Sequence, residues 1–174
     1  MVYSLKCCID IECNSLRNPD KIWCICVKDI DTGATYEYVH GTYGAFKDQA
    51  KGYTQVIGHN IIAYDLNWLH LLLGIQFDQR IILDTLVLSH LFHYAIPGGH
   101  SLEAWGERLK HAKVGLDIRD WSSYHSDMLL RCRNDVELNA KLYEFLRKKL
   151  DRKEFYKAIK VEHDTAFICA DMRS

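Results

Sequence analysis

The sequence predicts an α/β protein in which a mixed sheet is flanked by helices. Short apolar runs of strand character, separated by turn residues, fill the first part of the chain. From about residue 56 onward, short apolar strands alternate with longer segments of helical periodicity. The chain has 174 residues, of which 48% are hydrophobic and 26% are charged. These values are typical of one globular domain with a full core.

The first strands are expected to form an antiparallel meander. An apolar run from Val2 to Ile9 predicts a buried strand that delivers Asp10-Ile11-Glu12 to its carboxyl end, and a loop over 13–20 follows. The next strands are expected at 22–27 and 35–39, on either side of a hairpin turn.

The rest of the chain alternates in type. Further strands are expected at 56–59 and 81–84, and helices at 43–50, 65–73, 85–93, 102–109, 126–149 and 151–174. Pro97-Gly98-Gly99 breaks the chain, Ser101 caps the helix that follows, and 110–124 is expected to be irregular. We therefore divide the chain into a domain over 1–150 and a C-terminal helix over 151–174, which serves as a docking surface or leads into a further domain.

Charge and composition bear on the partners and the cellular compartment expected for this chain. The net charge of -1 carries no global basic signature, so a nucleic-acid role has to rest on a local site. The chain shows no secretory signal and no apolar run of about 18 residues, so we expect a cytoplasmic protein with no membrane partner. The seven cysteines lack zinc-type spacing, so we interpret them as reduced, small core residues.

Asp10 and Glu12 are the first candidates for chemistry. Residues two apart on a strand point to the same side of the sheet, so the two carboxylates project together. They repel each other unless a cation lies between them, and Mg²⁺ and Mn²⁺ prefer such oxygen ligands. Taken alone, the motif also describes an idle, solvated strand end.

Two further acids strengthen this interpretation. Asp65 opens the helix after the fourth strand, where the helix dipole favours a carboxylate, although an ordinary N-terminal cap has the same pattern. Asp135 lies in the long helix between Cys132 and Val136, two apolar positions that we expect to be buried. A lone aspartate in a helix is more often on a solvated face, so Asp135 is unusual.

At this point the motifs resemble a known family. Asp10-x-Glu12, Asn60-x-x-x-Tyr64-Asp65 and Asp135 are similar in order and spacing to the DEDD 3′–5′ exonuclease motif set. The segments LDTLVLS (83–89) and HSLEAWG (100–106) resemble the proofreading exonuclease domain of family A DNA polymerases from short-tailed, T-seven-like phages. The resemblance spans about residues 5 to 150.

The resemblance implies a ribonuclease-H-like fold with a mixed five-stranded sheet. It also implies that Asp10, Glu12, Asp65 and Asp135 hold two divalent cations, Mg²⁺ or Mn²⁺. Such a pair activates a water and stabilises the departing 3′ oxygen of a phosphodiester. The implied product is a nucleoside 5′-monophosphate.

Arg131 departs from the family pattern. The family has a tyrosine four residues before the last aspartate, where it orients the attacking water, or a histidine five residues before it. This chain has Arg131 and Leu130 at those positions. Arginine stays protonated and cannot act as a base, but it can pair with the scissile phosphate or with Glu12. We therefore place Arg131 among the catalytic residues, in an enzyme that is either slowed or attenuated.

Substrate contacts are expected from His59, Asn60 and Tyr64. The first two are candidates to bind the terminal nucleotide, although Asn60 can equally bond the backbone of its own turn. Tyr64 is a candidate to stack on an unpaired base, whereas for Trp105 we favour core packing. Asp84 is expected to be a structural acid beside the site. A basic cluster at 147–149 and 152–153 forms either a solvated face or a phosphate track.

The resulting hypothesis is a metal-dependent 3′–5′ DNA exonuclease that acts on a single-stranded 3′ end. It would serve as the proofreading subunit, or the covalently attached domain, of a phage DNA polymerase. Two alternatives stay open at this stage. One is a non-catalytic DNA-binding or scaffold subunit that docks a polymerase through its last helix, and the other is an exoribonuclease of the same superfamily.

Overall fold

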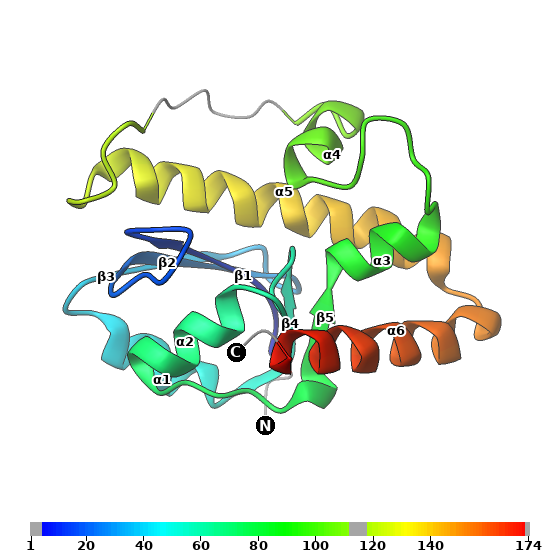
Figure 1. Cartoon of the computed structure of the whole chain (residues 1–174), viewed down its shortest axis with the longest axis horizontal. Helices are drawn as coiled ribbons and strands as arrows, with labels where there is room; N and C mark the ends of the chain where they lie inside the picture. Colours follow the sequence, from blue (N-terminus) through cyan, green and yellow to red (C-terminus); the bar gives the residue numbers. More distant parts are fainter. Residues whose placement is uncertain (1–4, 112–117, 173–174) are drawn as a thin grey trace.

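A single mixed sheet organises the molecule, for which a computed structural model describes residues 5–111 and 118–172. The strand order is β3-β2-β1-β4-β5 (Figure 1). The strands are β1 (Leu5–Cys13), β2 (Ile22–Asp29), β3 (Thr35–Val39), β4 (Tyr53–Gly58) and β5 (Ile82–Asp84). The first three are antiparallel neighbours, whereas β4 pairs in parallel with β1 and β5 in parallel with β4. This confirms the predicted mixed five-stranded sheet that begins with a meander.

Helices cover both faces of this sheet (Figure 1). They are α1 (Tyr43–Ala50), α2 (Asp65–Leu73), α3 (Thr85–Phe92), α4 (Leu102–Arg108), α5 (Ser126–Leu150) and α6 (Lys153–Asp171), with a short 3₁₀ helix at Gln79–Ile81. The long helix α5 packs on one face, against β1 and β2, while α1 and α2 pack on the other. Because both faces are covered, six of the nine residues of the central strand β1 are apolar, and the charged ones are Lys6, Asp10 and Glu12.

Side-chain alternation along β1 assigns residues to the two faces. Cys7, Ile9 and Ile11 enter the core beneath α1 and α2. Cys8 faces α5 and packs with Cys132 and other residues of that helix. Since successive side chains of a strand alternate, Asp10 and Glu12 share the α5 face with Cys8. The alternation therefore aims both carboxylates at the long helix.

A third cluster joins α3, α4, α5 and α6. Trp105 is 2% exposed and lies at its centre, with its Nε1 donating a 2.8 Å hydrogen bond to Ser89 Oγ. Phe155 and Ile159 bring α6 into the same cluster. The core position expected for Trp105 is therefore confirmed. Helix α6 packs on the rest of the fold over its whole length, reaching the core beneath α2 through Phe167.

Most differences from the expected elements are shifts of one to three residues at their ends, where hydrogen-bonding patterns fray. The segment 110–124 is free of helix and strand at its described positions. The expected beginning of the first strand at Val2, residues 112–117 and the last two residues lie outside the described part. Six cysteines are buried as predicted, but Cys169 on α6 is exposed, so its interpretation as a core residue was wrong.

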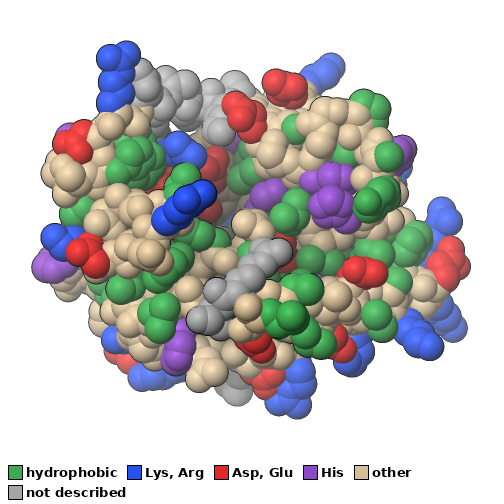
Figure 2. Space-filling model, viewed as in Figure 1, with side chains coloured by type: hydrophobic (Ala, Val, Ile, Leu, Met, Phe, Trp, Pro, Cys, Tyr) green, Lys and Arg blue, Asp and Glu red, His purple; other side chains and the backbone are tan. Residues whose placement is uncertain are grey.

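The surface carries acidic and basic side chains that alternate around the face seen in Figure 2, with no large area of one sign. This agrees with the net charge near zero. Within residues 5–111 and 118–172, no helix is long and apolar enough to cross a membrane.

Candidate metal centre

The candidate centre forms where the carboxyl end of β1 meets α5. In the sheet register, Asp10 lies opposite Cys26 and Glu12 opposite Cys24 of β2. Both neighbours are fully buried cysteines that pack under α5. Their small side chains allow the helix to approach the strands closely, so the two carboxylates lie at the helix–sheet boundary rather than in bulk solvent.

Helix α5 contributes Asp135 to this boundary. Cys132 and Val136 are fully buried against the sheet, which turns the neighbouring Asp135 inward, where it is 8% exposed. The Cys132 thiol donates a 3.2 Å hydrogen bond to the carbonyl oxygen of Asp10. This contact fixes the helix against the strand at the level of the acids.

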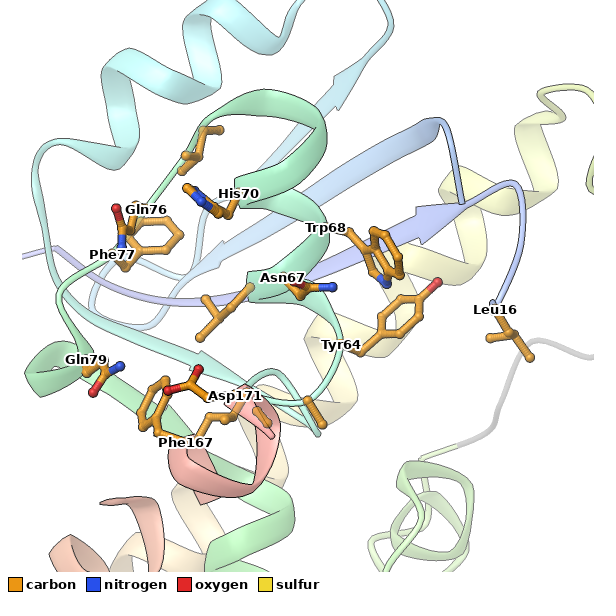
Figure 3. Close-up of a pocket in the computed structure, with 15 residues that line it drawn as sticks. Leu16, Tyr64, Asn67, Trp68, His70, Gln76, Phe77, Gln79, Phe167 and Asp171 are labelled. Atoms are coloured by element: carbon orange, nitrogen blue, oxygen red, sulfur yellow. The ribbon is translucent and has the colours of Figure 1, made fainter. Parts of the chain in front are cut away.

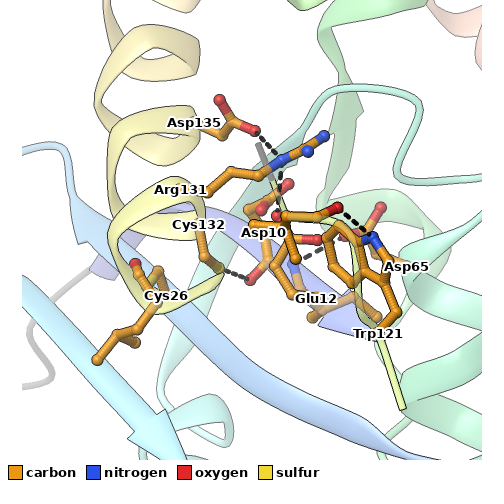
Figure 4. A network of polar contacts seen from close by, with 11 residues as sticks. Asp10, Glu12, Cys26, Asp65, Trp121, Arg131, Cys132 and Asp135 are labelled. Atoms are coloured by element: carbon orange, nitrogen blue, oxygen red, sulfur yellow. Dashed lines mark hydrogen bonds and ion pairs between the residues drawn. The ribbon is translucent and has the colours of Figure 1, made fainter. Parts of the chain in front are cut away.

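Asp10, Glu12 and Asp135 meet closely enough to hold a metal ion. Each offers a carboxylate oxygen, and the three oxygens lie within 4.8 Å of one another (Figure 4). Burial raises the pKa of Asp10 well above its ordinary value, and the carboxylates of Asp135, Asp65 and Glu12 raise it further. Acids that lie this close together and are partly or fully buried resist ionising together, and a cation bound between them would stabilise their charged forms. Oxygen donors in this arrangement suit a hard divalent cation such as Mg²⁺.

Asp65 lies beside the three but outside their close group. It begins α2 and is 5% exposed, and its Oδ1 accepts a 3.2 Å hydrogen bond from the backbone N–H of Ile11. Burial raises its pKa, backbone hydrogen bonds lower it, and the carboxylates of Asp84 and Glu12 raise it. Asp65 thus ties α2 to β1 between the two acids of the strand. Its role as a metal ligand stays a prediction.

Arg131 reaches from α5 into the same cluster (Figure 4). Its Nε lies 3.1 Å from Glu12 Oε1 and 3.8 Å from Asp135 Oδ2, one helical turn away. Its guanidinium carbon stands 5.6 Å from the ring centre of Trp121. The pairing with Glu12, one of the two partners considered for this residue, is therefore present in the structure.

The three expected substrate contacts fall around this edge of the sheet. His59 Nδ1 hydrogen-bonds Thr85 Oγ1 at 2.9 Å, and burial lowers the pKa of His59 to about 4, so the imidazole is neutral. Asn60 has a left-handed backbone with φ of 61° and an exposed side chain. Tyr64 donates from its hydroxyl to the carbonyl oxygen of Ser15 at 3.0 Å. None of these contacts tests nucleotide binding, which stays a prediction.

Asp84 is a structural acid. Its carboxylate accepts hydrogen bonds from the backbone N–H groups of Asn60, Ile62 and Leu86 at 2.9, 3.2 and 2.9 Å. These bonds shape the turn between β4 and α2 and cap α3. Its own N–H donates to His163 Nε2 at 2.8 Å. Sequence reasoning missed His163, because no local signal links two residues 79 positions apart.

The basic cluster lies away from the acids. Arg147 pairs with Glu144 at 3.0 Å and Arg152 with Glu154 at 3.7 Å, and all four side chains are exposed. Residue 147 is twelve positions beyond Asp135 on α5, or about 18 Å along the helix. These contacts favour the solvated-face interpretation over a phosphate track at the site.

A separate cavity of about 360 Å³ lies between α2 and the end of α6 (Figure 3). Tyr64 and Trp68 line one side of it, and their rings meet edge to face with centres 6.3 Å apart. Phe167 and Asp171 of α6 line another side. Tyr64 directly precedes Asp65 in the chain, but neither Asp65 nor Asp10, Glu12 or Asp135 lines this cavity.

Comparisons with known proteins agree with the resemblance read from the motifs. No protein-family profile matches the chain. In sequence, it is similar to the DNA-directed DNA polymerases of Enterobacteria phage T3 (26% identity) and Escherichia phage T7 (30% identity), each over 181 aligned positions. Both alignments cover 79% of this chain but 26% of the polymerase. The chain therefore spans about a quarter of the length of these relatives.

Solved structures confirm the ribonuclease-H-like fold. One, described as the apo form of a nuclease, matches with a TM-score of 0.74 and 16% identity over 98% of this chain and 84% of that one. Brucella melitensis NrnC matches with a TM-score of 0.72 and 17% identity over 98% and 85%. NrnC with bound Mg²⁺ matches with a TM-score of 0.67 and 16% identity over 98% and 86%.

Proposed function

We propose that this chain is a metal-dependent 3′–5′ exonuclease of the DEDD type. It would remove nucleotides from a single-stranded DNA 3′ end as nucleoside 5′-monophosphates. The observation that carries the proposal is the convergence of Asp10, Glu12 and Asp135, whose carboxylate oxygens lie within 4.8 Å of one another. Its relatives support it, because two are phage DNA polymerases and a structural neighbour was solved with bound Mg²⁺.

The chemistry follows from the donor set. Two divalent cations would supply a water of lowered pKa and neutralise the charge on the departing 3′ oxygen. Asp10, Glu12 and Asp135 would hold them, with Asp65 as the fourth ligand beside the group. Neutral His59 and Asn60 would contact the terminal nucleotide by hydrogen bonds, and the Tyr64 ring would stack on a base.

We further infer a proofreading role beside a DNA polymerase, in the cytoplasm where such a polymerase works. Because the chain matches about a quarter of each phage polymerase, the partner is either a covalent domain or a separate subunit. Helix α6 is the proposed junction, since it carries the exposed apolar side chains Tyr156, Val161 and Ile168, and Met172 directly after it is exposed as well. The core contacts of α6 mean that deleting it would also disturb the fold. Substitution of Val161 and Ile168 by serine is therefore the sharper test of docking.

The nuclease is tested on single strands labelled at the 5′ or the 3′ end, with Mg²⁺ or Mn²⁺. The wild-type chain should shorten the 5′-labelled strand stepwise and release the 3′ label first. Asp10→Ala should abolish this, while Asp48→Ala should not, because Asp48 is exposed and pairs with Lys51 away from the cluster. A wild-type chain as inert as Asp10→Ala with both metals would refute the enzyme proposal. Matched RNA strands would reveal an exoribonuclease.

One observation favours the scaffold alternative. Arg131 already neutralises part of the cluster by pairing with Glu12 and Asp135. In an attenuated nuclease, Arg131→Tyr should raise the rate of hydrolysis. DNA binding without hydrolysis in both proteins would support the scaffold instead.

A further inference from the structure

We propose that Arg131 is a built-in counter-ion of the metal centre, which competes with divalent cations for Glu12 and Asp135 and so sets the affinity for metal. The inference rests on the proposed function, because it takes the carboxylate cluster to be a metal centre. Arg131 would act as a positioning residue that controls when the acids are available as ligands.

The geometry places one positive charge at the mouth of the cluster. Arg131 Nε is 3.1 Å from Glu12 Oε1 and 3.8 Å from Asp135 Oδ2, which are two of the three proposed ligands. The side chains of both acids are 12% exposed, and the Nε atom itself is buried. Charges that are partly withdrawn from water interact more strongly than surface pairs. The guanidinium therefore neutralises the acids that a cation would otherwise neutralise.

Trp121 holds the guanidinium in this place. The Arg131 guanidinium carbon lies 5.6 Å from the centre of the indole ring, within the range of a cation–π contact. The ring is itself fixed, since Trp121 Nε1 donates to the carbonyl oxygen of Ile118 at 3.1 Å. The carbonyl oxygen of Trp121 accepts from Trp23 Nε1 at 2.9 Å. A fixed aromatic face offers the guanidinium a second partner, so Arg131 can release Glu12 and keep its contact with Trp121.

Arg131 and a metal ion would compete because both would contact Glu12 and Asp135. A divalent cation and the guanidinium seek the same oxygens, and like charges at this distance repel. Metal binding therefore has to displace the ion pairs of Arg131. Removing the charge at this position should tighten metal binding, and keeping the charge should preserve the weaker affinity.

Calorimetric titration of the folded chain with Mn²⁺, without any nucleic acid, tests this separately from activity. Arg131→Met keeps much of the side-chain length without the charge, and we expect it to bind Mn²⁺ about tenfold more tightly. Arg131→Lys keeps the charge and should stay close to the wild type. Arg133→Met is the matched control, because Arg133 lies on the same helix and pairs with Glu37. Its affinity for Mn²⁺ should be unchanged.

A second measurement uses the wild-type chain, so it does not depend on any variant folding. The NMR resonance of the Arg131 Nε–Hε group should shift during a titration with Mg²⁺. The shift should saturate at the same Mg²⁺ concentration as the heat of binding. Equal Mn²⁺ affinities of wild type and Arg131→Met, or a resonance that Mg²⁺ leaves unmoved while heat is released, would overturn the inference alone. No binding by the wild type or by any variant would overturn the metal centre as well.

Discussion

The backbone N–H of Asp84 donates a 2.8 Å hydrogen bond to Nε2 of His163, which joins the last helix to the strand end beside the candidate metal centre. His163 Nδ1 bonds the carbonyl oxygen of Ile159 at 2.7 Å, one turn back along α6. Because Nε2 accepts, Nδ1 carries the proton and donates in this pair. A neutral imidazole thus links α6 to the residue that shapes the turn before Asp65.

His163→Ala should lower the free energy of unfolding by about 1–3 kcal/mol, since it leaves the buried N–H of Asp84 without an acceptor. His163→Gln should recover part of this loss, because its amide oxygen can accept. Urea unfolding followed by circular dichroism measures the change, with His40→Ala at an exposed position as the control. Wild-type stability in His163→Ala would mean that water replaces the imidazole at no cost.

Gly58 ends β4 where the chain approaches itself closely. A Cβ atom built there would lie 2.4 Å from Cβ of Ile61, which belongs to the turn leading to α2. We expect Gly58→Ala to destabilise the fold by about 1–3 kcal/mol, because the turn has to shift. Gly44→Ala is the matched control in α1, where nothing lies within 4 Å, and it should stabilise by about 0.5–1 kcal/mol. Thermal unfolding of the two variants should therefore move in opposite directions.

His59 should make stability depend on pH. Burial lowers its pKa from 6.5 to about 4 in the folded chain, so below pH 6.5 the unfolded chain binds the proton more readily. The contribution of His59 to the free energy of unfolding is on the order of 3 kcal/mol. It is complete above pH 6.5 and is lost as the pH falls to about 4. The unfolding free energies of wild type and His59→Asn are measured from about pH 8 to about pH 4, a range that spans the pKa values of His59 in the folded and unfolded chains. The difference between the two proteins should shrink toward acid pH. A constant difference would contradict this.

Asp10 should make the free energy of unfolding depend on metal binding. Its pKa is raised by burial and by neighbouring carboxylates, so in chelator the charged cluster opposes folding. Asp10→Asn should therefore be more stable than the wild type in EDTA, by about 1–2 kcal/mol. Saturating Mg²⁺, at a hundred times its dissociation constant, should stabilise the wild type by about 2.7 kcal/mol and the variant much less.

Urea unfolding in EDTA and in Mg²⁺ separates the two effects of Asp10→Asn. Asp48→Asn serves as the control, since Asp48 is exposed and pairs with Lys51. Equal stabilisation of wild type and Asp10→Asn by Mg²⁺ would place the ion elsewhere on the chain.

Local patterns were enough to predict the elements of the fold. Apolar runs and turn residues predicted the meander, and the apolar positions Cys132 and Val136 predicted the buried face of α5. These signals are local because a strand or helix repeats its exposed and buried sides every few residues. The Asp10-x-Glu12 spacing likewise predicted that both carboxylates share one side of the sheet.

The positions of Arg131, Asp65 and His163 could not be predicted in this way. The motif comparison marked Arg131 as unusual but left its partner open, and only the packing of α5 on β1 places it between Glu12 and Asp135. The hydrogen bond from Ile11 to Asp65 and the one from Asp84 to His163 join residues 54 and 79 positions apart.

The sequence by itself therefore determined the α/β class, the order of the elements and the acids that the resemblance selects. The tertiary structure decided which of those acids meet. It also decided that Asp65 is held beside them by the backbone N–H of Ile11, and that the Arg131 side chain pairs with Glu12 and Asp135. The physical reason is that periodicity acts within one element, whereas these contacts depend on how two elements pack. Packing is set by all the side chains between them, including the small buried cysteines of β2 that lie opposite Asp10 and Glu12 and pack under α5.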